Sequence, residues 1–309
     1  MRLNTIKASL FLLLLVSNIS FAGVYRWVDE NGRVHFGDSK PETSTKSTDN
    51  LSKQYAQPRR NFEVTVTTVN YDLPLDTKRK IITTVKKIFY ILNEYNQIPF
   101  PEDSSIDITL FGNQKEFINF QKKNLSAIVS NTGYYSRKSN QAFVWKNRSV
   151  KRMMDVITHE AFHTIMLTNY KHVPPWLNEG LAEYFELINV FGTAAAIPIS
   201  KGWTKTVKAA LLQKDVLPPV SEYLDMNHRQ WHTLNKDGSI SYAMGWSLTY
   251  YLMSSKKGRQ LILNVLQETK KDKDALSTTI VENAYAGGVQ KLQTDWESWV
   301  FGRKTAHRY

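Results

Sequence analysis

The chain has 309 residues, and its 40 lysines and arginines outnumber its 28 aspartates and glutamates, which gives a formal net charge of +12. An apolar fraction of 42% beside only 22% charged residues is typical of a globular protein and excludes a disordered or fibrous chain. The sequence contains no cysteine, which excludes disulfide frameworks, thiolate zinc fingers, iron–sulfur clusters and cysteine nucleophiles. Any catalytic chemistry must therefore use His, Asp, Glu, Tyr, Ser or Lys side chains.

The first 22 residues have the pattern of an export signal. A basic segment precedes an apolar run over residues 10–16, and the small residues Ser20 and Ala22 follow at the positions that signal peptidase reads. The run is too short to span a bilayer, and no later stretch reaches the roughly 20 apolar residues of a membrane helix. We therefore expect residues 1–22 to be a signal peptide and the mature chain to be exported without a transmembrane helix, to the periplasm or beyond the cell.

The positive charge of the mature chain favours anionic surroundings, because a net charge acts as a long-range field. An anionic cell-envelope polymer is therefore a candidate partner. Export and the lack of a clustered basic motif argue against nucleic acid as a partner.

A small β module is expected over residues 23–39. Asn31-Gly32 is a strong hairpin signal, and a two-residue turn there sets Trp27 opposite Phe36. The segment resembles a short module of unknown role at the start of many exported bacterial proteins, and the pattern is met by Tyr25, Trp27, Asp29, Gly32 and Asp38. Since so small a hairpin is marginal alone, we expect it to pack on a further strand or on the main domain.

A polar segment separates this module from the rest of the chain. Residues 40–61 are rich in Ser, Thr, Lys, Gln, Asn and Pro, which predicts a linker. The main domain is expected over residues 62–309, with early strands and a helical pattern after Ser149, so the class should be α+β. The early strands are expected at residues 62–66, 106–111, 133–136 and 141–145, with a helix over residues 76–95.

Three ionisable residues interrupt a segment that is otherwise apolar nearly all round, residues 153–167. These residues are His159, Glu160 and His163, and burying them in a helix is costly unless something satisfies them. Residues four apart lie on one helix face, so the two imidazoles can bind one metal ion, with Glu160 at the open coordination side. This H-E-x-x-H pattern predicts a zinc site with Glu160 as general base. Two ordinary helix histidines are the alternative that the motif alone leaves open.

The segment W-L-N-E-G-L-A-E-Y-F over residues 176–185 places Glu179 and Glu183 on one helix face. Together with H-E-x-x-H it resembles the gluzincin metallopeptidases, both the aminopeptidase-type branch and the smaller exported peptidase MA-like proteins. The resemblance implies an α+β, thermolysin- or aminopeptidase-like catalytic domain with one zinc ion. It implies that Glu179 is the third zinc ligand and that Glu183 hydrogen-bonds a ligating histidine. The two segments are a few residues closer together than in those relatives, which leaves Glu183 as the alternative ligand.

The same resemblance suggests further site residues. The segment from Ser241 to Leu248 looks like the Tyr-x-x-Gly helix start of aminopeptidase-type relatives, so Tyr242 is the candidate oxyanion stabiliser, and His232 is the alternative. In gluzincins the strand before the metal helix lies at the sheet edge and pairs with the substrate backbone. The resemblance gives this role to residues 141–146, with the candidate substrate contacts Gln141, Phe143 and Trp145, although the two aromatic residues fit a core equally well.

The function expected from these residues is that of an exported zinc peptidase acting on a peptide or protein substrate. No Gly-x-Met-x-Asn strand of the aminopeptidase kind precedes the motif, which favours an endopeptidase or oligopeptidase. One alternative is a catalytically inactive scaffold of the cell envelope that binds metal or peptide. Another is a wall-binding or structural protein in which the helix histidines are incidental.

Overall fold

In the computed structural model the chain divides into two units, with the boundary between residues 59 and 60. The predicted signal peptide and the Asn31-Gly32 turn lie outside the described residues. The described residues are 25–28, 34–37, 48–50, 62–213, 216–234 and 240–309.

The N-terminal unit contains a three-stranded antiparallel sheet in the order β2-β1-β3. Its strands are β1 (Tyr25–Val28), β2 (Val34–Gly37) and β3 (Thr48–Asn50). The predicted hairpin is present, but its predicted register is wrong, because Trp27 pairs with His35 and Phe36 pairs with Arg26. Val28 pairs with Val34, so an odd number of residues joins the strands and the register moves by one. The strand β3 lies within the predicted linker and gives the hairpin a further partner.

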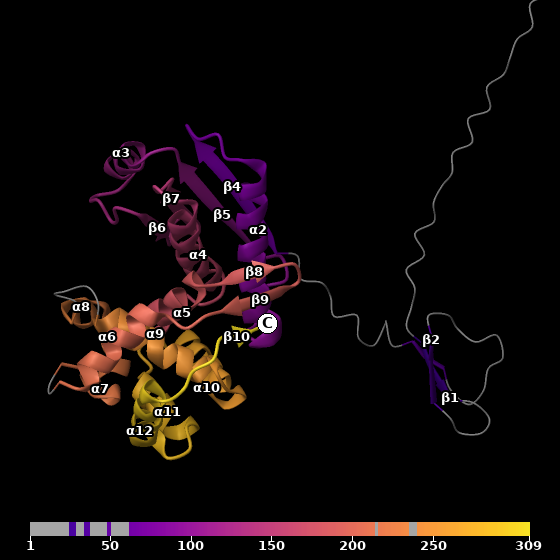
Figure 1. Cartoon of the computed structure of the whole chain (residues 1–309), viewed down its shortest axis with the longest axis vertical. Coiled ribbons are helices and arrows are strands. Elements are labelled where there is room, and N and C mark those ends of the chain that lie inside the picture. Colours follow the sequence, from indigo (N-terminus) through magenta and orange to yellow (C-terminus); the bar gives the residue numbers. More distant parts are fainter. Residues whose placement is uncertain (1–24, 29–33, 38–47, 51–61, 214–215, 235–239) are drawn as a thin grey trace, which may run out of the picture. The chain divides into compact units, whose positions relative to one another are not determined.

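The second unit begins with a four-stranded mixed sheet in the order β4-β5-β7-β6 (Figure 1). Its strands are β4 (Glu63–Val69), β5 (Ser105–Phe111), β6 (Gly133–Ser136) and β7 (Gln141–Trp145). The strands β4, β5 and β7 are parallel, whereas β6 runs antiparallel to β7. The prediction that residues 141–146 form the edge strand is therefore wrong, since β7 is paired on both sides and β6 is at the edge.

The two faces of this sheet are covered by different helices. α2 (Leu75–Tyr90), continued by a π-helical turn η1 (Ile91–Tyr95), and α4 (Val150–Leu167) pack on one face, and α3 (Gln114–Asn124) packs on the other. Alternation along β7 directs Ala142 and Val144 toward the core with α4. Phe143 and Trp145 lie in the cluster with α3, so these two predicted substrate contacts are core residues of the opposite face.

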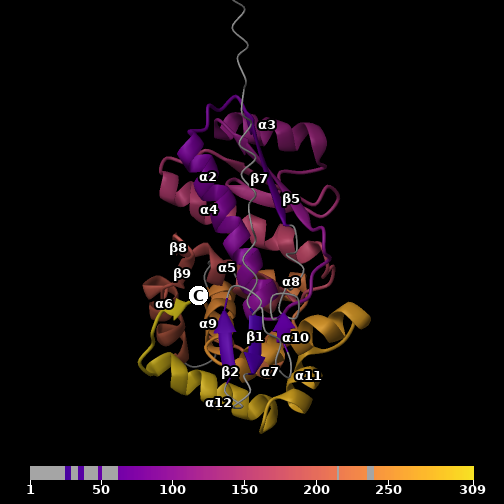
Figure 2. The same ribbon diagram turned by 90° about the vertical axis from the view of Figure 1, so that its right-hand side faces the viewer.

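The rest of this unit is mainly helical, which confirms the predicted α+β class. Its helices are α5 (Pro175–Glu186), α6 (Lys201–Leu211), α7 (Val220–Leu224), α8 (His228–Thr233), α9 (Ile240–Met253), α10 (Lys256–Lys271), α11 (Ser277–Ala284) and α12 (Gly288–Phe301). In both views α5 and α9 lie between the main sheet and α12 (Figures 1 and 2). Within the described part of the chain, no helix is both long enough and apolar enough to cross a membrane.

A small second sheet, in the order β10-β9-β8, interrupts the predicted helical half. Its strands are β8 (Asn189–Phe191), β9 (Ala194–Ile197) and β10 (His307–Arg308). Sequence analysis missed it because strands of two to four residues, one of them largely alanine, show no measurable alternation. The side chain of His307 secures β10, since its Nδ1 lies 2.7 Å from the hydroxyl of Tyr184 on α5.

The helices α5 and α9 cross at two glycines, and α5 also packs against α4. A Cβ atom added to Gly180 would lie 2.3 Å from Oγ1 of Thr249 and 2.5 Å from the carbonyl oxygen of Gly245. Such distances force the helices apart, so we expect Gly180→Ala to lower the free energy of unfolding by about 1–3 kcal/mol. Chemical denaturation of the purified variant measures this change.

The matched control for this prediction is Gly202, which lies exposed in helix α6. The nearest atom to a Cβ added there is Oγ of Ser200, at 4.0 Å. Gly202→Ala is expected to leave stability unchanged or to raise it by up to about 1 kcal/mol, because alanine favours a helix over glycine. Equal stabilities of the two variants would contradict the close crossing of α5 and α9.

Candidate metal centre

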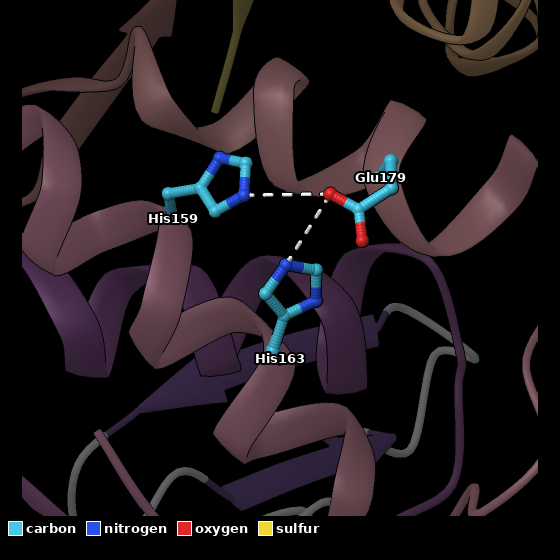
Figure 3. Close-up of side chains that lie close together, drawn as sticks. All are labelled: His159, His163 and Glu179. Carbon is cyan, nitrogen blue, oxygen red and sulfur yellow. Dashed lines mark ion pairs between the residues drawn. The ribbon is translucent and has the colours of Figure 1, made fainter. Parts of the chain in front are cut away.

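Three of the predicted side chains meet between helices α4 and α5. Nε2 of His159 lies 3.5 Å from Oε2 of Glu179, and Nε2 of His163 lies 3.6 Å from the same oxygen. Figure 3 shows the two rings of α4 and the carboxylate of α5 pointing toward one another. These distances exceed the 2.7–3.2 Å of an N–H···O hydrogen bond. They match the separation of about 3.4 Å between two ligands of a tetrahedral zinc ion. The three residues form a group that could hold a metal ion.

The polar contacts of the Nδ1 atoms indicate that each imidazole faces Glu179 with its Nε2. Nδ1 of His163 lies 3.1 Å from Oδ1 of Asn178, whose amide nitrogen donates to Glu179 at 3.3 Å. Because an amide oxygen only accepts, Nδ1 of His163 carries the hydrogen and Nε2 presents a lone pair. Nδ1 of His159 faces carboxylate oxygens at 3.3 Å (Glu186) and 3.7 Å (Glu183), although neither contact has full hydrogen-bond geometry.

The donor set therefore fits a cation. Two imidazole lone pairs and a carboxylate converge on one point, and such an arrangement is unfavourable unless a proton or a metal ion lies between them. Burial alone would lower the pKa of His159, but the carboxylates of Glu179 and Glu186 raise it well above its usual value. Burial would raise the pKa of Glu179, yet the adjacent imidazoles of His163 and His159 hold it well below its usual range. Both shifts favour positive charge next to Glu179.

Two further carboxylates hold His159 from its other side. Nε1 of Trp203 donates to Oε2 of Glu183 at 2.8 Å, and the guanidinium of Arg152 lies 2.8 Å from Oε1 of Glu186. Burial raises the pKa of Glu183 to about 7. The structure thus places Glu183 at Nδ1 of His159, on the far side of the ring from Glu179. This position fits an acid that orients the ring rather than one that shares an ion with both histidines.

Sequence reasoning missed Asn178 and Glu186. Asn178 belongs to the W-L-N-E-G-L-A-E-Y-F segment, and a buried amide next to a predicted ligand is a natural partner for an imidazole. Glu186 lies three residues after Glu183, so helical spacing alone could have found it on the same face.

Glu160 lines a cavity of about 370 Å³ together with the three ligand candidates. Its side chain is buried, and burial raises its pKa. The edge strand β6 passes directly over it, because a Cβ atom added to Gly133 would lie 3.2 Å from Cγ of Glu160 and 2.6 Å from Cγ1 of Val156. Only a glycine at this position lets the strand approach the metal helix so closely.

The cavity also contains one of the two oxyanion candidates. Tyr242 is half-buried in its lining, and its ring packs edge-on against the buried Trp231 with centroids 4.6 Å apart. Burial raises the pKa of Tyr242, so its hydroxyl stays protonated at neutral pH and can donate a hydrogen bond. His232 is exposed and does not line the cavity.

None of the three predicted edge-strand contacts lines the cavity. Nε2 of Gln141 donates to Oγ1 of Thr109 at 2.8 Å, within the sheet, and Phe143 and Trp145 lie on the α3 side. Tyr135 of β6, instead of these residues, lines the cavity. Its ring lies 4.5 Å from that of His163, between centroids.

Two families of unknown function match parts of the chain. "Protein of unknown function (DUF1570)" matches residues 153–274, and "Domain of unknown function (DUF4124)" matches residues 11–63. A comparison with curated proteins found no match.

The DUF1570 match contains α4 from Met153 onward, the whole of α5, and Tyr242. The DUF4124 match contains the small N-terminal sheet. Neither description states an activity. The edge strand β6 lies outside both matches, so its place over the cavity is known only from the structure.

Proposed function

We propose that this chain is an exported zinc-dependent peptidase. The observation that carries the proposal is the convergence of His159, His163 and Glu179 in one cavity that also contains Glu160. Two histidines and one carboxylate leave a coordination position open, which is typical of catalytic rather than structural zinc sites. When bound, zinc supplies Lewis acidity, which lowers the pKa of water and polarises a carbonyl group.

The other side chains of the site transfer the proton, stabilise the oxyanion and orient the imidazole rings. The carboxylate of Glu160 accepts a proton from the attacking water and returns it to the nitrogen of the leaving amine. The hydroxyl of Tyr242 donates a hydrogen bond to the oxygen that becomes negative as the peptide bond is attacked. Asn178 and Glu186 keep the imidazole rings in orientation.

The strand β6 is suited to hold the substrate. It forms an edge of the main sheet, it lies over Glu160, and Tyr135 from it lines the cavity. An extended peptide can add to such an edge through backbone hydrogen bonds, which places a peptide bond beside the metal centre. A mixed sheet with an antiparallel edge strand, followed by the two metal-binding helices, supports a thermolysin- or aminopeptidase-like catalytic domain. Substrate binding by β6 replaces the edge-strand role that was predicted for residues 141–146.

Removal and return of the metal test the proposed function. We expect the purified protein to contain about one zinc ion per chain and to cleave members of a broad peptide library. A chelator should abolish cleavage, and zinc should restore it, while magnesium should not, because nitrogen ligands suit zinc. Elemental analysis and mass spectrometry of the products measure both quantities.

Two outcomes would contradict this proposal. Zinc-loaded protein that binds peptides and cleaves none would instead identify a catalytically inactive scaffold of the cell envelope. Natively purified protein without bound metal would favour a structural or polymer-binding role for the basic surface.

A further inference from the structure

A second cleft, of about 580 Å³, adjoins the metal centre. Tyr135 lines both spaces, and its ring packs on that of the ligand candidate His163. The cleft extends past the turn that follows β6, the segment between α4 and α5, and the start of α8. A peptide lying on β6 at the metal centre would therefore place its neighbouring residues in this cleft.

Positive charge predominates at the mouth of this cleft. Arg137, Lys171 and Lys273 line it and are exposed. The guanidinium of Arg137 donates to the backbone carbonyl of Lys171 at 2.8 Å, which holds the guanidinium in place. Among the described residues, no carboxylate forms an ion pair with either Arg137 or Lys171.

The carboxylates in the cleft already have partners. Asp274 forms an ion pair with the adjacent Lys273, with Nζ 3.0 Å from the nearer oxygen. Asp225 accepts the backbone N–H of Thr278 at 3.0 Å. Arg137 and Lys171 are thus cations of the cleft that an anionic ligand can still neutralise, whereas Asp225 keeps its own negative charge.

The side chain of His228 also lines this cleft. Burial and the nearby charge of Arg137 lower the pKa of His228, while Glu179 acts in the opposite direction. Its imidazole is therefore neutral at pH 7, so it can hydrogen-bond a ligand without adding charge.

We infer that this cleft, through Arg137 and Lys171, selects peptides that carry a carboxylate near the bond to be cleaved. The inference rests on the proposed function, because it concerns a subsite of the same centre. Two cations without carboxylate partners attract an anionic group and repel the ammonium of a free amino terminus. The carboxylate can come from an acidic side chain or from the carboxyl terminus of the peptide, and both present the same chemistry to a guanidinium.

Matched peptides test the inference. The parent is any peptide that the protein cleaves, with Glu or Gln placed at each of the three positions on either side of the cleaved bond, and with free or amidated carboxyl termini. For Glu over Gln at one or more positions we expect a preference in kcat/KM of about 5- to 10-fold, because ion pairs at exposed sites are individually weak. The preference should decrease as salt is added. If only a free carboxyl terminus is preferred, the source is the terminus rather than a side chain.

The variants Arg137→Gln and Lys171→Gln should each reduce this preference, and the double variant should abolish it. The matched control is Lys138→Gln, since Lys138 is exposed in the same turn but does not line the cleft. Binding of fluorescent Glu and Gln peptides to Glu160→Gln protein gives a second readout that needs no turnover.

The outcomes separate this inference from the proposed function. If the wild-type protein cleaves no peptide, the proposed function fails. If it cleaves Glu and Gln peptides equally well, or if the double variant keeps the preference, only the inference about the cleft is overturned.

Discussion

Replacement of Glu160 by glutamine is expected to lower kcat/KM for peptide hydrolysis by about 100- to 10,000-fold, the range typical of a lost general acid–base group. Glutamine has nearly the same shape as glutamate, but its amide cannot accept the proton of the attacking water. Glu160 lies outside the convergent group of His159, His163 and Glu179. The variant should therefore keep its zinc while it loses activity.

Kinetics and elemental analysis on the same protein samples check both parts of this prediction. The matched control is Glu222→Gln, which makes the same chemical change at an exposed residue of the short helix α7. Glu222→Gln should retain wild-type activity and zinc. Loss of zinc from Glu160→Gln would identify Glu160 as a ligand, and unchanged hydrolysis would place the base elsewhere.

The sequence was most informative where one helix determines the geometry. His159 and His163 are four residues apart, so a helix brings them onto one face whatever surrounds it. The helix α4 is buried as its apolar composition predicts, and Pro175 begins α5. That α4 and α5 lie next to each other depends on the fold, and this was implied only by the family resemblance.

Which strands pair, and in which register, could not be predicted from the sequence. Alternation along residues 141–145 indicates a strand, but it does not show that β5 and β6 occupy both sides of it. In the hairpin, a turn signal at Asn31-Gly32 predicted a register that differs by one residue from the observed Val28–Val34 pairing. The position of β7 in the sheet and the register of the hairpin are thus set by backbone hydrogen-bond pairing rather than by local propensity.

The orienting side chains were missed for a different reason. Asn178 and Glu186 act on the imidazoles through single hydrogen-bond or ion-pair distances. Helical spacing places Glu186 on the same face as Glu183, but it does not show that this face meets the imidazole rings until the crossing of α4 and α5 is known. That crossing also determines whether Glu179 or Glu183 is the third ligand.

Glu179→Ala is expected to reduce zinc affinity more strongly than Glu183→Ala does. Oε2 of Glu179 lies within 3.6 Å of Nε2 of both His159 and His163, so its removal takes away one of three ligands. Of the two imidazoles, Glu183 approaches only that of His159, with its Oε1 3.7 Å from Nδ1. Its loss should cost about 10- to 100-fold in zinc affinity, as is typical when a partner that orients a ligand is removed.

Zinc titration and thermal unfolding measure this difference without any peptide. Zinc should raise the unfolding temperature of the wild-type protein, because an ion that binds only the folded state stabilises it. At the same excess of zinc the rise should be smaller in Glu183→Ala than in the wild-type protein, because its zinc affinity is about 10- to 100-fold weaker, and it should be smallest in Glu179→Ala. The two variants match in chemistry and lie one turn apart on α5, so a general loss of stability would affect both. The reverse order would make Glu183 the ligand, as the short spacing between the two sequence segments allows, and would require α5 to rotate relative to α4.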